Sequence, residues 1–138
     1  MKKMKRILFV EDNAEYREKI AQILLVSNYE VDAVENAVIG IEKFVEKEYD
    51  LVLSDLQMEM MNGVRFISYI KKINPTIKTI ILTGEPTADS EIKALTIEID
   101  KYLRKDIRMD VLLKYIEIVL EMPTSVSDSE LILESRID

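Results

Sequence analysis

The sequence predicts an α/β domain in which a parallel sheet lies between layers of helices. Short apolar runs alternate along the chain with segments in which apolar residues recur at helical spacing. Continuous runs such as residues 7–10 and 51–53 are typical of strands that are buried on both faces. The 138 residues are enough for one domain with a substantial core, and 48% of them are hydrophobic.

The first two strand–helix units occupy the N-terminal third of the chain. A strand over about residues 6–10 is apolar until two acids end it, and a shorter strand is expected near residues 30–34. Each is followed by a segment with apolar residues on one helical face. The inward-facing residues predicted for these helices are Tyr16, Ile20, Ile23 and Leu24, and then Ala37, Ile41, Phe44 and Val45.

Three further units complete the predicted domain. Strands are expected at about residues 50–54, 77–82 and 99–103, and a methionine-rich loop follows the first of these. Each strand again precedes a segment of helical period. The inward-facing residues predicted for the three helices are Val64, Ile67 and Ile70, then Ala88, Ile92 and Leu95, and finally Val111, Leu112, Tyr115, Ile116, Val119 and Leu120.

The composition excludes several classes of chemistry. The chain has no cysteine and no histidine, which excludes disulfides, thiolate metal sites, Ser-His catalysis and a phosphohistidine on this chain. A net charge of −7 argues against direct binding to nucleic acid. No stretch is apolar enough to span a membrane, and the run after the basic N-terminus is too short for a signal peptide. We therefore expect a cytoplasmic protein without a membrane contact.

Five polar side chains follow the predicted strands directly. Glu11 and Asp12 follow the first strand, Asp55 the third, Thr83 the fourth and Lys105 the fifth. Because parallel strands end at one edge of the sheet, we expect these groups to meet there. Close carboxylates repel unless a cation or proton lies between them, and Mg²⁺ prefers carboxylate and carbonyl oxygens. The set predicts a Mg²⁺ site that serves phosphoryl transfer.

Each polar or aromatic residue near this edge, taken alone, has an ordinary structural explanation. Asp12, with Glu15 three residues later, resembles a helix N-cap, and Asp106 could cap the last helix. An aromatic residue such as Tyr102 in a half-buried strand is normally a packing residue. The joint placement at one edge is what favours a functional site.

This arrangement resembles the response-regulator receiver domain of two-component signalling over about residues 5–121. The matching segments are Glu11-Asp12, Asp55 with the loop to Asn62-Gly63, Thr83-Gly84, Tyr102 and Lys105. The resemblance implies a doubly wound, flavodoxin-like (βα)5 sandwich of three layers with strand order 2-1-3-4-5. This strand order comes with the resemblance and is not an independent deduction, because a receiver protein is among the standard examples of it.

The resemblance also implies a role for each matching residue. Asp55 is expected to accept the phosphoryl group, and Thr83 and Lys105 to bind its oxygens. Glu11, Asp12, Asp55 and the backbone carbonyl of Gln57 are expected to hold Mg²⁺. Thr83 and Tyr102 are expected to form the switch that alters the surface of the fourth helix, the last strand and the last helix.

Four positions depart from the family pattern. Glu59 and Asp106 replace prolines, and Glu98 replaces a small residue that is often glycine. Since a non-proline cis bond costs about 2.5–4 kcal/mol, we expect a trans bond before Asp106 or an altered loop. Gly84, where alanine is common, either widens access to the phosphoryl group or is neutral.

The leading hypothesis is therefore a signalling module that a partner histidine kinase or phosphotransfer protein phosphorylates. Its signal would pass to an output protein or domain, and a phosphorylation-dependent homodimer is compatible with this function. Residues 1–122 are assigned to the receiver domain. Residues 123–138 are assigned to a polar tail or the start of a linker, so the receiver either stands alone or has been severed from an output domain. Residues 131–133 could form a short helix or a docking peptide, or belong to a frayed terminus.

Three other functions remain open from the sequence. A receiver-like scaffold would bind partners without phosphorylation, which the altered loops allow. A Mg²⁺-dependent phosphatase usually needs a second aspartate two residues after the nucleophile, but that position is Gln57. A flavodoxin-like cofactor binder lacks support because the chain has no glycine-rich phosphate loop and no tryptophan.

Overall fold

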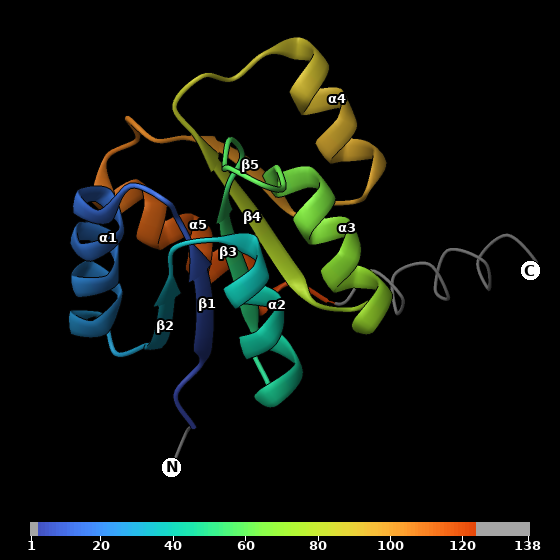
Figure 1. The fold of residues 1–138 in the computed structure, drawn as a ribbon. Helices are drawn as coiled ribbons and strands as arrows, with labels where there is room; N and C mark the ends of the chain where they lie inside the picture. Colours follow the sequence, from blue (N-terminus) through green and yellow to red (C-terminus); the bar gives the residue numbers. More distant parts are fainter. Residues whose placement is uncertain (1–2, 124–138) are drawn as a thin grey trace, which may run out of the picture.

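Strands and helices alternate strictly along the chain in the computed structural model, which describes residues 3–123 (Figure 1). The elements are β1 Arg6–Val10, α1 Ala14–Val26, β2 Glu30–Val34, α2 Ala37–Glu46, β3 Leu51–Asp55, α3 Gly63–Ile73, β4 Lys78–Thr83, α4 Ala88–Thr96, β5 Lys101–Arg104 and α5 Met109–Glu121. The strands are parallel and ordered β2-β1-β3-β4-β5. The predicted fold class and strand order are confirmed. The apolar triplet at residues 131–133 lies outside the described residues.

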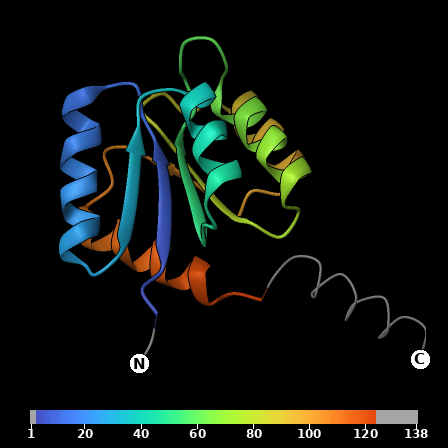
Figure 2. The same cartoon turned by 60° about the horizontal axis from the view of Figure 1, so that its bottom comes forward.

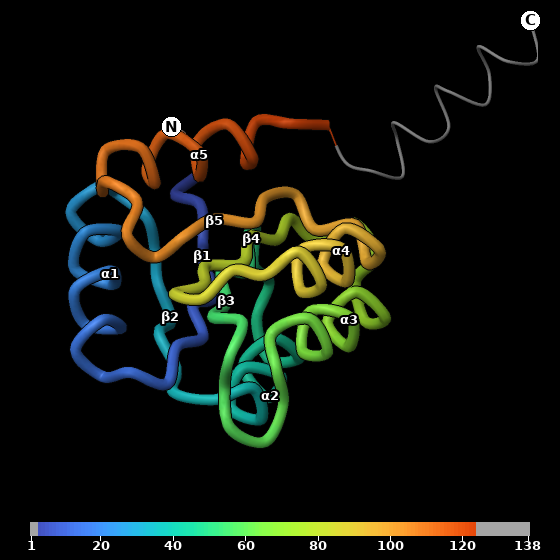
Figure 3. Tube along the Cα trace, turned by 90° about the horizontal axis from the view of Figure 1, so that it is seen from above, coloured from blue at the N-terminus to red at the C-terminus, as the bar shows by residue number. Residues whose placement is uncertain are grey.

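The sheet separates two apolar cores. Helices α1 and α5 cover one face, and α2, α3 and α4 cover the other (Figures 2 and 3). Alternate strand residues supply the two cores, as the period of two requires. Leu51 and Leu53 pack toward α1 and α5, whereas Val52 packs toward the other three helices. Burial on both faces explains the uninterrupted apolar runs inside β1, β3 and β4.

One predicted inward-facing residue of α2 is exposed. Ala37, Gly40 and Phe44 are the buried residues of this helix, at a spacing of three and four. Val45 follows Phe44 by one position and is therefore rotated about 100° away from the core. Its side chain is 64% exposed, so the prediction for Val45 is wrong.

The predicted inner face of α4 is wrong as a whole. Ala88, Ile92 and Leu95 are exposed, and Ala94 is the one buried residue of the helix. Two stripes with the same helical spacing compete in this segment, and Ser90, Ala94 and Ile97 form the one that faces the sheet. The larger apolar side chains thus lie on the solvent side of α4.

The register of the sheet brings the ends of the strands together. Val10 is paired with Ser54, Asp55 with Leu82, and Thr83 with Arg104. Each polar residue predicted to form a site therefore lies within one position of its neighbour across the strands. Within the described residues, no helix is long and apolar enough to cross a membrane.

Candidate functional site

The loop after β1 supplies two carboxylates with different environments. Glu11 is fully buried, and its N–H extends the sheet by donating to the Val34 carbonyl at 3.0 Å. Asp12 is exposed. Neither Asp12 nor Asp106 caps a helix, so those interpretations are wrong. The N-cap of α1 is Asn13, whose side chain accepts from the Tyr16 N–H at 2.8 Å and whose own N–H donates to Glu11 Oε2 at 3.1 Å.

Asp55 is held at the end of β3 by the turn that follows it. It is 3% exposed, and the Gly63 N–H donates to the carbonyl of Leu56 at 2.7 Å. A Cβ on Gly63 would lie 2.2 Å from the Asp55 carbonyl oxygen, so the backbone approaches more closely than any side chain permits. Gln57, whose carbonyl was expected near a metal, is exposed in this loop.

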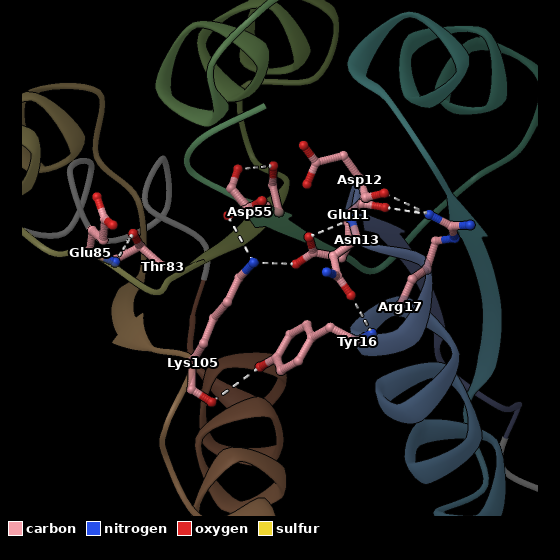
Figure 4. Close-up of polar contacts among 10 residues, drawn as sticks. Glu11, Asp12, Asn13, Tyr16, Arg17, Asp55, Thr83, Glu85 and Lys105 are labelled. Carbon is pink, nitrogen blue, oxygen red and sulfur yellow. Dashed lines mark hydrogen bonds and ion pairs between the residues drawn. The ribbon is translucent and has the colours of Figure 1, made fainter. Parts of the chain in front are cut away.

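Lys105 joins the acids from the end of β5 (Figure 4). Its Nζ lies 2.7 Å from Glu11 Oε1 and 3.3 Å from Asp55 Oδ1. The lysine side chain is 22% exposed, so both ion pairs are largely shielded from water. The structure therefore brings Glu11, Asp12, Asp55 and Lys105 together at the predicted edge.

Burial shifts the ionisation of these groups. It is the main cause that raises the pKa of Glu11 to about 7, against the opposing effects of Lys105 and the Asn13 N–H. Burial also raises the pKa of Asp55 more than Lys105 lowers it. Burial by itself would lower the pKa of Lys105, but Glu11 and Asp55 outweigh it and raise that pKa. The site holds more negative charge than one ammonium neutralises, which favours an added cation.

These shifts predict how the stability of the metal-free protein depends on pH. Glu11 has a pKa near 4.5 when unfolded and about 7 when folded, so the folded state binds more protons between these values. The free energy of unfolding should fall by about 2–3 kcal/mol as pH rises from 4.5 to 7 and then level off. Urea unfolding in the presence of a chelator measures this slope. Glu11→Gln should make the slope shallower, with the raised pKa of Asp55 contributing to what remains, and a stability that rises across this window would contradict the assignment.

Thr83 and Tyr102 lie on the face of the sheet that α4 covers. Thr83 is 1% exposed, and its hydroxyl accepts from the Glu85 N–H at 3.1 Å. Tyr102 pairs in register with Ile81, two positions before Thr83, and packs against the core below α4. Its hydroxyl lies 2.5 Å from the hydroxyl of Ser90, which forms the capping box of α4 with Thr87. Tyr102 is therefore connected to the first turn of α4.

Two departures from the family pattern coincide with unusual backbone. Met60, which follows Glu59, has φ 73°, and the Met61 N–H donates to the Glu59 carbonyl at 2.8 Å around it. Glu98 has φ 60°, a left-handed conformation that favours glycine, and its carbonyl accepts from Lys71 Nζ at 2.8 Å. The small residue usual at the Glu98 position thus has a backbone reason.

The other two departures, Asp106 and Gly84, require no unusual backbone or close contact. Within residues 3–123 there is no cis peptide bond, so the expected trans bond before Asp106 is confirmed. Asp106 instead forms an ion pair with Arg104 at 3.1 Å. A Cβ on Gly84 would meet only Lys105 Cδ, at 3.9 Å, so alanine would fit at this position.

The three acids fit a hard cation. One oxygen each from Glu11, Asp12 and Asp55 lie within 4.8 Å of one another. Opposite ligands of Mg²⁺ are separated by about 4.2 Å, given bonds of 2.0–2.1 Å, so small side-chain movements would gather them. The buried Oε1 of Glu11 lies 2.7 Å from the ammonium of Lys105 but accepts no hydrogen bond of good geometry within the described residues. An acceptor left in this way is suited to metal ligation.

Two residues near the site carried no functional signal in the sequence. Tyr16 was assigned only to the core face of α1, yet Lys105 Nζ lies 5.0 Å from its ring centroid. Arg17 donates to the carbonyl of Glu11 at 2.8 Å and to that of Asp12 at 3.4 Å, which holds the acidic loop. The Tyr16 contact joins residues 89 positions apart, so local spacing does not reveal it.

The chain is similar in sequence to known proteins over most of its length. The family described as response regulator receiver domain matches residues 7–117. The regulatory protein VanRB of Enterococcus faecalis is 32% identical over 115 residues, which are 83% of this chain and 52% of VanRB. The chain spans between a quarter and about half of the curated relatives it matches.

Solved structures agree with this similarity. A CheY-like receiver domain protein from Methanospirillum hungatei has a TM-score of 0.84 at 28% identity, covering 86% of this chain and 95% of its own. TrrA from Thermotoga maritima, solved in complex with Mg²⁺-BeF, has a TM-score of 0.77 at 31% identity, covering 84% of this chain and 99% of its own. The similarity thus covers both the fold and the sequence of the region that carries the acids.

Proposed function

Because the chain belongs to the response regulator receiver domain family, we propose that it accepts a phosphoryl group on Asp55 and thereby switches a protein-interaction surface. Receiver domains are signalling modules that work with kinases and output domains. The observation that carries the proposal is the position of the buried Asp55 carboxylate, which lies beside two further acids and 3.3 Å from Lys105 Nζ. The proposal includes a histidine kinase or phosphotransfer protein as the phosphoryl donor. It also includes a cytoplasmic location.

The chemistry follows from the groups around Asp55. A carboxylate oxygen attacks the phosphorus of the donor phosphohistidine, and a P–O bond forms as the P–N bond breaks. The electron pair of that bond passes to the histidine ring, and Asp55 becomes an acyl phosphate. Lys105 and the hydroxyl of Thr83 bind oxygens of the transferred group. A Mg²⁺ held by Glu11, Asp12, Asp55 and the Gln57 carbonyl would neutralise charge on the reacting oxygens.

Asp12→Asn tests the metal assignment separately. Asp12 is exposed and has no role in the sheet or as a helix cap, so its replacement should leave the fold intact. Loss of one ligand charge should weaken Mg²⁺ binding by at least about tenfold, since even outer partners of a metal site contribute that much. Calorimetric titration with Mg²⁺ measures the affinity. An unchanged affinity would remove Asp12 from the proposed ligand set.

The proposed switch acts through Thr83 and Tyr102. Tyr102 packs on the core below α4, in register with Ile81 two positions before Thr83, so a movement of Thr83 toward the phosphoryl group would free space near its ring. Any shift of Tyr102 must break or carry its hydrogen bond to Ser90 in the first turn of α4. The outer side of that helix exposes Ile92 by 63% and Leu95 by 60%. These side chains are suited to a partner protein or a second copy of the chain.

Incubation with acetyl phosphate and Mg²⁺ tests the proposed function without a partner. The protein should gain one acid-labile phosphoryl group, and a chelator should prevent this. No gain at saturating Mg²⁺ would contradict the proposal and favour the scaffold that works without phosphorylation. Sustained turnover of a free phosphoester would instead favour the phosphatase.

A further inference from the structure

Lys105 has an uncharged neighbour in addition to its two carboxylates. The ring centroid of Tyr16 lies 5.0 Å from Lys105 Nζ, within the range of a cation–π interaction. The Tyr16 hydroxyl also donates to the backbone carbonyl of Lys105 at 3.4 Å. Figure 4 shows the ring beside the lysine side chain. Tyr16 therefore contacts Lys105 both at its backbone and near its charged end.

Tyr16 is itself fixed by the elements around it. It lies in the first turn of α1, where its N–H donates to the N-cap Asn13 at 2.8 Å. Its side chain is half-buried and packs against the core that α1 and α5 share. The ring borders a cleft of about 590 Å³ that Lys19 and Lys105 also line. A ring held in this way gives the ammonium a defined neighbour on the cleft side.

The ring differs from the carboxylates in one respect. Glu11 and Asp55 are the proposed metal ligands, so a cation would compete with Lys105 for their oxygens. Tyr16 offers no oxygen to a cation through its ring face, so a bound cation would not compete with the ammonium for this neighbour. Because a lysine side chain has many rotamers, a fixed neighbour reduces the number that it samples.

We propose that Tyr16 is a positioning residue that keeps the ammonium of Lys105 directed at the oxygens around Asp55. The inference rests on the proposed function, since phosphorylation of Asp55 supplies its kinetic measurement. Tyr16 touches neither the phosphoryl donor nor the metal in this proposal. It acts through the orientation of Lys105.

The chain contains a matched control for this contact. Lys101 Nζ lies 5.1 Å from the ring centroid of Tyr115, a lysine–tyrosine pair on β5 and α5 at nearly the same distance. The variants are Tyr16→Met, Tyr16→Phe and Tyr115→Met. Methionine fills space flexibly but removes the ring, whereas phenylalanine keeps the ring and removes the hydroxyl. Urea unfolding confirms that each variant is folded before it is assayed.

The measurements are the initial rate of phosphorylation by acetyl phosphate at saturating Mg²⁺, and the affinities for Mg²⁺ and for beryllofluoride. Tyr16→Met should slow phosphorylation and weaken beryllofluoride binding by about two- to fivefold, the size of a cation–π contact. Its Mg²⁺ affinity should stay within about twofold. Tyr16→Phe and Tyr115→Met should match the wild type.

Three results would overturn the proposal. They are an unchanged rate in Tyr16→Met, an equal loss in Tyr115→Met, and a loss in Tyr16→Met that parallels a loss of Mg²⁺ affinity. If Tyr16→Met does not fold, Tyr16→Leu takes its place with the same expected losses, and an unchanged rate in the folded Tyr16→Leu variant overturns the proposal. Failure of the proposed function has a different signature, because the wild type itself would then gain no phosphate.

Discussion

Gly63→Ala is expected to lower the free energy of unfolding by about 3 kcal/mol or more, the upper end of the usual cost of overpacking. The added Cβ would lie 2.2 Å from the Asp55 carbonyl oxygen and 3.0 Å from the Leu56 Cα. Both are backbone atoms, so no side-chain rotation relieves the contact. The protein must move either the start of α3 or the end of β3. In the second case Asp55 leaves its place beside Lys105.

The other two glycines of the chain provide controls for this prediction. A Cβ on Gly40 would meet the ring of Phe66 at 3.0 Å, and a side chain can give way. A Cβ on Gly84 has only an ordinary contact with Lys105 at 3.9 Å. Equilibrium urea unfolding should therefore rank the losses as Gly63→Ala, Gly40→Ala and Gly84→Ala, with the last within about 1 kcal/mol of the wild type. A Gly63→Ala variant as stable as Gly84→Ala would contradict the close approach.

The layers of the fold were predictable because the signal lies within each element. Strands buried on both faces are continuously apolar, and this pattern located β1, β3 and β4 within one residue at each end. The inner face of α4 was not predictable from the same pattern. Its stripe of large side chains, Ile92 and Leu95, has the same period as the stripe that the fold buries. The buried side of α4 includes Ser90, whose hydroxyl contacts that of Tyr102 on β5. The two residues belong to different elements, so the pattern within α4 does not reveal this contact.

The candidate site was predictable in its members but not in its environment. The ends of parallel strands meet at one edge, so the placement of Glu11, Asp55 and Lys105 together follows from the strand assignment. That Glu11 is fully buried whereas Asp12 is exposed depends on how α1 begins, and the N-cap proved to be Asn13. The Tyr16 contact depends on the packing of α1 beside the loop before α5, which no short motif encodes.

Asp55→Asn is expected to abolish phosphorylation, the largest functional effect expected of any single substitution in the site. The amide is nearly the same size as the carboxylate, but it is a poor nucleophile toward phosphorus. Folding should not be impaired, because burial raises the pKa of Asp55 and so disfavours the charge that the substitution removes. A matched control is Asp89→Asn on α4, an exposed aspartate whose partner is Lys93 at 3.1 Å. The control should be phosphorylated like the wild type.

The most direct test of the proposed function is the intact mass of the protein after incubation with acetyl phosphate and Mg²⁺, followed by mapping of the modified peptide. The wild type and Asp89→Asn should each gain one phosphoryl group on the peptide that contains Asp55. Asp55→Asn should gain none, with unfolding and Mg²⁺ titration confirming that this variant is folded. A phosphoryl group that still appears in Asp55→Asn, or that maps to another peptide of the wild type, would contradict the assignment of Asp55 as the phosphoacceptor.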